Sequence, residues 1–176
     1  MRLRTRLMSV VVLAATTGLS ALSGQAQASP SSSLFLLSPS HNPVNAAKHL
    51  SALPTVKQSI FASSWATEFV GMDPSGVPQY HISFTGTGVK KCMDTASGGV
   101  SAGTAVTAVA CTAFSQSSTQ NWRLVGTGVS GKVKMLNTRS GLVAGIRGAS
   151  TAEGAVLELQ NDVSAPHQIM WQTSVE

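Results

Sequence analysis

Few side chains in this sequence could take part in chemistry. Its 176 residues include two cysteines, four histidines and seven acidic residues. In an exported chain, two cysteines favour a disulfide over the alternative of two free thiols. We therefore expect a bond between Cys92 and Cys111. It would close a loop of about 20 residues and contribute roughly 3 kcal/mol to stability in the chain-entropy model.

The remaining reactive side chains do not have the spacing of a catalytic or metal site. The histidines His41, His49, His81 and His167 form no His-x-x-x-His pair. No serine lies in a Gly-x-Ser-x-Gly turn, and no pair of acids suggests glycoside hydrolysis. The sequence therefore predicts no enzyme activity, no cofactor and no metal site.

One glycine pattern, running from Gly126 to Gly131, matches the Gly-x-Gly-x-x-Gly fingerprint of dinucleotide-binding proteins. That fingerprint requires a strand before it and a helix after it. Strand-like residues 132–136 follow the glycines here. We expect a hairpin loop and no nucleotide site.

The N-terminus has the layout of a secretory signal peptide. Three arginines precede a mostly apolar run over 7–22, and Ala26 and Ala28 offer a small-x-small cleavage site. We expect residues 1–28 to be removed and the mature protein to be secreted. Removing three arginines lowers the formal charge from +5 to +2. Because the remaining basic residues are scattered, we expect no nucleic-acid partner. The apolar run is short and is interrupted by Thr16, Thr17 and Gly18, so we expect no membrane span.

The elements that would position these residues change character along the chain. Asn42-Pro43 looks like a helix N-cap followed by proline, and apolar residues at helical spacing predict a short helix over 44–53. From residue 59 onwards, short strand-like runs alternate with turn residues. The tryptophans Trp65, Trp122 and Trp171 each precede such a run, and we expect all three in the core.

One small β unit occurs twice. Its first copy ends in Gln120-Asn-Trp122, and its second copy ends at Trp171 with two fewer residues before the tryptophan. Gln168 then lies one residue out of register. The paired positions are Cys92 with Val143, Asp94 with Gly145, Gly103 with Gly154, Val106 with Leu157, and Cys111 with Asp162. Repetition at this period indicates a repeat-built fold.

Cys-x-Asp, Gly-x-x-Val, Cys and Gln-x-Trp, in this order, resemble the ricin B-type lectin family. The resemblance is good over 80–125, fair over 132–171 and poor before that. It implies an all-β fold, a β-trefoil of three units. We accordingly expect a trefoil domain over 59–176, and residues 29–58 as either an irregular N-terminal extension carrying the helix or a divergent first unit.

The same resemblance implies a sugar site. It gives the carboxylate as Asp94, polar groups as Thr107, Thr119 and Gln120, and the stacking aromatic as a position that Val109 occupies here. Asp94 could instead cap a turn, and Gln120 could bind backbone. The second copy has Gly145 and Gln160 at the carboxylate and aromatic positions. The expected function is a secreted, non-enzymatic, lectin-like module whose degenerate site binds a glycan weakly or at a shifted position.

Two alternatives involve protein partners. The layout of signal peptide, irregular segment and worn trefoil is similar to that of the A and C subunits of cytolethal distending toxins. This similarity implies an accessory subunit that binds a host surface and docks a catalytic toxin subunit. The other alternative is a trefoil that binds another protein without ligand chemistry.

Overall fold

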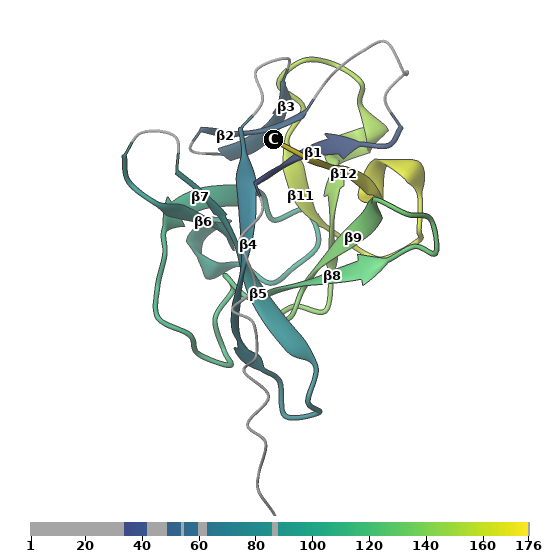
Figure 1. Ribbon diagram of the computed structural model, residues 1–176. Coiled ribbons are helices and arrows are strands. Elements are labelled where there is room, and N and C mark those ends of the chain that lie inside the picture. The colour runs from purple at the N-terminus through teal and green to yellow at the C-terminus, as the bar shows by residue number, and fades with distance from the viewer. Residues whose placement is uncertain (1–33, 42–48, 54, 60–62, 86–87, 176) are drawn as a thin grey trace, which may run out of the picture.

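The computed structural model describes residues 34–41, 49–53, 55–59, 63–85 and 88–175 (Figure 1). The predicted signal peptide over 1–28 lies outside these residues. The described residues form a single twelve-stranded sheet, and three short 3-10 turns are their only helical elements. The protein is therefore all-β, as the resemblance implied.

The strands fall into three units of four. In the first unit the strands are β1 (Phe35–Pro39), β2 (His49–Leu53), β3 (Thr55–Ser59) and β4 (Trp65–Met72). In the second they are β5 (Pro78–Phe84), β6 (Lys91–Thr95), β7 (Val106–Ala110) and β8 (Trp122–Gly126). In the third they are β9 (Lys132–Asn137), β10 (Val143–Ile146), β11 (Leu157–Gln160) and β12 (Met170–Ser174). The 3-10 turns are η1 (Ala96–Gly98), η2 (Arg147–Ala149) and η3 (Pro166–Gln168).

The outer two strands of every unit form a closed barrel. Antiparallel pairing runs from β1 to β4, β5, β8, β9 and β12, and β12 pairs with β1 again. The inner two strands of each unit pair as hairpins, β2–β3, β6–β7 and β10–β11. A six-stranded barrel with three such hairpins is a β-trefoil.

The core follows from the alternation of side chains along these strands. Trp65 and Trp122 are fully buried at the starts of β4 and β8. All three units contribute to one hydrophobic cluster, which includes Leu37, Ile82, Met93, Met135, Ile146, Leu157 and Leu159. The three hairpins therefore share their core with the barrel.

Trp171 is not a core residue, contrary to the expectation from sequence. Its side chain is 41% exposed, and Met170 beside it is fully buried. Successive residues of a strand point to opposite faces, so only one of the two can face the core. Gln168 follows Gln120 by 48 residues, and Met170 follows Trp122 by the same 48 residues. The second copy is therefore shorter by three residues, not two, and Gln168 is in register.

The helix expected over 44–53 is also wrong where the structure describes it. Residues His49–Leu53 form β2, which pairs with β3 and buries Ala52 opposite Val56. Residues 42–48 lie outside the described part. Because β1 pairs with both β12 and β4, we infer that residues 35–72 are the divergent first unit. Among the described residues, no helix has the length and hydropathy needed to cross a membrane.

Candidate functional site

The β6–β7 hairpin positions the residues singled out from the sequence. Its inward face is buried and carries Met93 and Val106. Asp94 lies directly opposite Thr107 in the antiparallel register, and both side chains are partly exposed. The turn η1 follows β6 and reverses the chain toward β7. The alternation of the two strands therefore presents Asp94 and Thr107 on one outward face.

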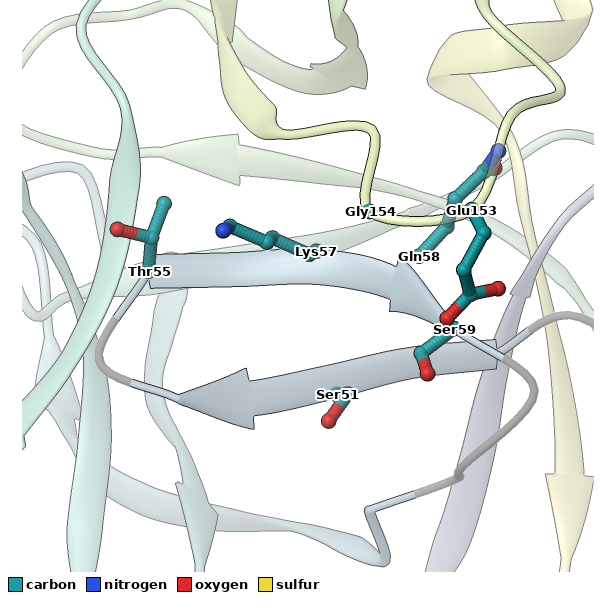
Figure 2. Close-up of a pocket in the computed structure, with 7 residues that line it drawn as sticks. All are labelled: Ser51, Thr55, Lys57, Gln58, Ser59, Glu153 and Gly154. Carbon is teal, nitrogen blue, oxygen red and sulfur yellow. The ribbon is translucent and has the colours of Figure 1, made fainter.

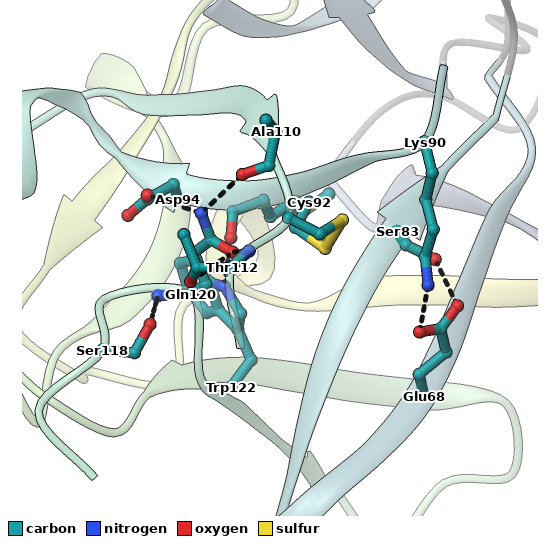
Figure 3. The surroundings of a disulfide bond; sticks show 12 residues. Glu68, Ser83, Lys90, Cys92, Asp94, Ala110, Thr112, Ser118, Gln120 and Trp122 are labelled. Atoms are coloured by element: carbon teal, nitrogen blue, oxygen red, sulfur yellow. Dashed lines mark hydrogen bonds and ion pairs between the residues drawn. A yellow bond between two sulfur atoms is a disulfide. The ribbon is translucent and has the colours of Figure 1, made fainter. Parts of the chain in front are cut away.

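The predicted disulfide is confirmed. Cys92 and Cys111 are bonded, with their Cα atoms 4.9 Å apart. The bond joins β6 to the residue immediately after β7 and lies beside Asp94, Gln120 and Trp122 (Figure 3). It fixes the point at which the chain leaves the hairpin for the loop over 111–121.

Three donors within the protein hold the Asp94 carboxylate. Oδ1 accepts hydrogen bonds from the Thr119 hydroxyl at 2.5 Å and from the backbone N–H of Thr95, the residue after Asp94, at 2.7 Å. Oδ2 accepts one from Gln120 Nε2 at 3.1 Å. The structure thus brings Asp94, Thr119 and Gln120 together in one network, the Asp94 network. Thr107 lies beside it across the strand pair.

Gln120 has a structural role in this network. Only 2% of its surface is exposed. Besides Asp94, its amide donates to the Ala110 carbonyl at 3.0 Å and accepts from Thr112 N–H at 2.9 Å (Figure 3). With both ends of the amide occupied, Gln120 orients Asp94 and ties the loop to the hairpin. This is the alternative role that the sequence left open.

The network leaves limited capacity for a ligand. A carboxylate offers about four acceptor positions, and Asp94 uses three of them internally. The free position is on Oδ2, where a sugar hydroxyl could donate. Val109 on the facing strand is 39% exposed but has no aromatic face. The site can therefore accept a charge-assisted hydrogen bond but cannot stack on a pyranose ring.

The third unit rebuilds the network with other residues. Gln168 donates to the Asn161 carbonyl at 2.7 Å and accepts from Val163 N–H at 3.0 Å, as Gln120 does in the second unit. Its Nε2 also donates to Gln160 Oε1 at 3.2 Å. The Gln160 amide oxygen thus takes the place of an Asp94 oxygen, although Gln160 extends from the opposite strand.

The first unit has a pocket of about 240 Å³ on its β2–β3 hairpin (Figure 2). Ser51 and Lys57 face each other there, at the positions of Asp94 and Thr107. The loop that carries Glu153 crosses from the third unit and closes one side. The buried amide of Gln58 holds that loop by donating to the Ala152 carbonyl at 2.6 Å. The carboxylate near this hairpin therefore comes from a neighbouring unit.

Outside the three hairpins, the structure has an ion pair and two histidines whose surroundings were not expected from the sequence. The Lys134 ammonium donates to Asp162 Oδ2 at 2.5 Å, and this hydrogen bond is the main cause of the lowered Asp162 pKa. Burial lowers the pKa of His81 and of His167. Within the described ranges, no group of three or more His, Cys, Asp or Glu side chains could hold a metal ion.

Comparison with known proteins relates the chain by fold. No protein-family model and no curated protein matches its sequence. The designed threefold-symmetric protein ThreeFoil matches with a TM-score of 0.64 and 21% identity, over 81% of this chain and 99% of its own.

Two natural proteins show the same similarity over part of their length. An exo-β-1,3-galactanase from Clostridium thermocellum has a TM-score of 0.65 and 16% identity, over 83% of this chain and 31% of its own. A Polyporus squamosus lectin, solved with the human-type influenza-binding epitope, has a TM-score of 0.61 and 19% identity, over 80% of this chain and 48% of its own. The chain spans less than half of either protein. These similarities show that the chain has a β-trefoil fold.

Proposed function

We propose that the chain is a secreted, non-enzymatic carbohydrate-binding protein. The observation that carries this proposal is the Asp94 carboxylate, held rigidly on a partly exposed face by Thr95, Thr119 and Gln120. A preorganised carboxylate forms strong hydrogen bonds with sugar hydroxyls at little entropic cost. The similarity in fold to a glycan-bound lectin supports the same function.

The absence of an aromatic at Val109 sets the expected affinity. Stacking contributes about 0.5–1.5 kcal/mol beyond the area it buries. Without it, we expect Asp94 and Thr107 to bind a glycan in the millimolar range. Thr119 and Gln120 would act by holding Asp94 in place.

A glycan array with the mature protein tests this function. We expect binding to a subset of glycans, and we expect Asp94→Ala to weaken it at least about tenfold, the effect of one charged hydrogen bond. Asp162→Asn is the matched control, since it removes one charge from the third unit. A protein that binds no glycan at millimolar concentrations would exclude the proposed function.

A second candidate is an accessory subunit that docks another protein, as in the toxins whose layout the chain resembles. The observation in its favour is a group of exposed apolar side chains near the end of the β4–β5 hairpin, where Phe69 is 46% and Met72 50% exposed. A neighbouring gene for a nuclease or ADP-ribosyltransferase would support it, provided that the two products form a complex that Phe69→Ser weakens. An isolated gene would count against it.

A further inference from the structure

A second site, separate from the Asp94 network, lies beside the β4–β5 turn. It is a cleft of about 300 Å³ between this turn, the loop over 111–121 and the paired strands β8 and β9. Figure 1 shows the β4–β5 hairpin projecting from the barrel next to β8. The side chains that matter here are Asp73, Pro74, Arg123, Leu136 and Thr138. None of them belongs to the Asp94 network.

The walls of the cleft are held together by specific contacts. Gln116, from the loop, donates its Nε2 to the Met72 carbonyl at 2.6 Å. The ring of Phe114 packs on Gly71, where a Cβ would lie only 2.7 Å from the ring. The loop is thus fixed to the hairpin at two points. The cleft is preformed, as small-molecule sites usually are.

Asp73 supplies an acceptor on one side. Its Oδ1 accepts hydrogen bonds from Ser75 N–H at 2.8 Å, the Ser75 hydroxyl at 2.6 Å and Val77 N–H at 2.9 Å. These bonds shape the turn and lower the Asp73 pKa, and the nearby Arg123 lowers it further. Its Oδ2 accepts no hydrogen bond from any residue that the structure describes. One oxygen of an ionised carboxylate therefore remains for a ligand.

Arg123 supplies donors on the other side. It lies in β8 opposite Leu136 of β9, and its side chain is partly buried. Its guanidinium forms no hydrogen bond and no ion pair within the described part of the chain. A guanidinium has five N–H donors, and removing them from water without acceptors is costly. Arg123 is therefore ready to donate to a ligand.

The charges of the cleft select the class of ligand. A carboxylate disfavours an anion, and a guanidinium disfavours a cation, so a neutral ligand with both donors and acceptors fits best. Neighbouring hydroxyls of a pyranose meet this requirement, and the apolar side chains of Leu136 and Pro74 can cover the C–H face of the ring. The volume is at the lower limit of known ligand sites, which suits one sugar unit.

We propose that this cleft binds one neutral pyranose unit, with Asp73 accepting from two adjacent hydroxyls and Arg123 donating to a hydroxyl or ring oxygen. The site is additional to the one at Asp94, and it deepens the proposed function, on which it rests. It also explains how a trefoil without a stacking aromatic at Val109 can bind a glycan at a shifted position.

Titration of the mature protein with free monosaccharides, followed by NMR, tests the proposal. The probes are galactose, N-acetylgalactosamine, glucose and mannose, with glucuronic acid as the anionic comparison. We expect at least one neutral sugar to shift the amide signals of Arg123, Leu136 and Thr138 saturably, and glucuronic acid to bind at least about tenfold more weakly. Arg123→Gln and Asp73→Asn should each weaken binding about tenfold or more.

The control variants separate the two sites. Asp73→Asn leaves a side-chain oxygen that can accept the hydrogen bonds of the turn, so a loss of binding in this variant reports the lost charge. Arg139→Gln removes an exposed cation outside the cleft and should leave binding unchanged. If only Asp94→Ala weakens binding, the cleft proposal is wrong and the proposed function stands. If no sugar shifts any signal and the array is also blank, both are wrong.

Discussion

At Gly145, the missing side chain makes room for the amide of Gln160. A Cβ at this position would lie 2.4 Å from Gln160 Oε1 and 3.0 Å from Gln168 Cγ. Gln160 cannot move away without losing its hydrogen bonds to Gln168 and His167. The glycine that looked like a lost carboxylate is therefore part of a repacked network.

We predict that Gly145→Ala destabilises the protein by about 1–3 kcal/mol, the usual cost of overpacking. The matched control is Gly126→Ala, because a Cβ at Gly126 meets no atom within 4 Å. Urea denaturation of both variants measures the difference. Equal midpoints would show that Gln160 moves aside without cost.

The two histidines with lowered pKa values predict how stability depends on pH. Burial disfavours the charged form of His81 and of His167, so their pKa values in the folded state lie below the unfolded value of about 6.5. The unfolded chain then binds more protons between these values, and stability rises with pH there. The stabilising effect of the two neutral histidines should be complete above about pH 6.5 and should decline as the pH falls toward their pKa values in the folded state.

The melting temperature at pH 7.5 and at pH 5.5 checks this. We expect a decrease at pH 5.5 in the wild type and a smaller one in the double variant His81→Gln, His167→Gln. Asp73 and Asp162 do not interfere, because carboxylates with lowered pKa values lose their stabilising effect only at still lower pH. If the melting temperature of the double variant falls between pH 7.5 and pH 5.5 by as much as that of the wild type, other groups are responsible.

Among the elements, the β6–β7 hairpin depends on its disulfide. The Cys92–Cys111 bond closes a loop with a sequence separation of 19 residues. Replacing both cysteines with serine should cost roughly 3 kcal/mol, mainly by freeing the unfolded chain. It should also loosen the loop that carries Thr119 and Gln120, and thus weaken the glycan binding that we propose. Denaturation of the variant, compared with the oxidised wild type, measures the first effect, and reduced wild type is the control that should match the variant. A variant as stable as the oxidised wild type would refute it.

Elements with strong local signals could be predicted from the sequence, and those decided by pairing could not. Two cysteines and a Gln-x-Trp identified the second unit because each has a single structural role there. In the third unit Met170 takes the core position, and a search for tryptophan selects Trp171 instead. Aligning on Gln168 would have found the correct register, since its buried amide binds the loop backbone as Gln120 does.

The same difference applies to the candidate site. Asp94 and Gln120 could be found because a motif carries them. The cleft at Arg123 joins three segments with no shared motif, and only the folded chain brings Asp73 close to it. Sites made at junctions between units depend on the tertiary fold, so the pattern of one unit does not reveal them.

For the whole molecule, the first unit completes the barrel. β1 pairs with β12 over five residues and with β4, and these pairs close the barrel between the first and last strands. The same unit adds Phe35, Leu37, Ala52 and Val56 to the shared core. A chain without them would leave β12 and β4 as open edges and expose the core of the other two units.

We therefore predict that a chain beginning at residue 59 does not fold cooperatively, whereas one beginning at residue 29 does. Phe35, Leu37 and Val56 each contribute about 1.5–3 kcal/mol by burial, so losing them costs an amount comparable to the 5–15 kcal/mol by which domains are usually stable. The barrel also loses its closing strand. Dispersion of amide NMR signals and the sharpness of thermal unfolding distinguish the two chains. Adding a peptide of residues 29–58 to the shorter chain should restore the dispersion, because β1 would again find its partner strands. A shorter chain that folds alone, with a sharp transition, would show that residues 29–58 are an extension and that the barrel closes without them.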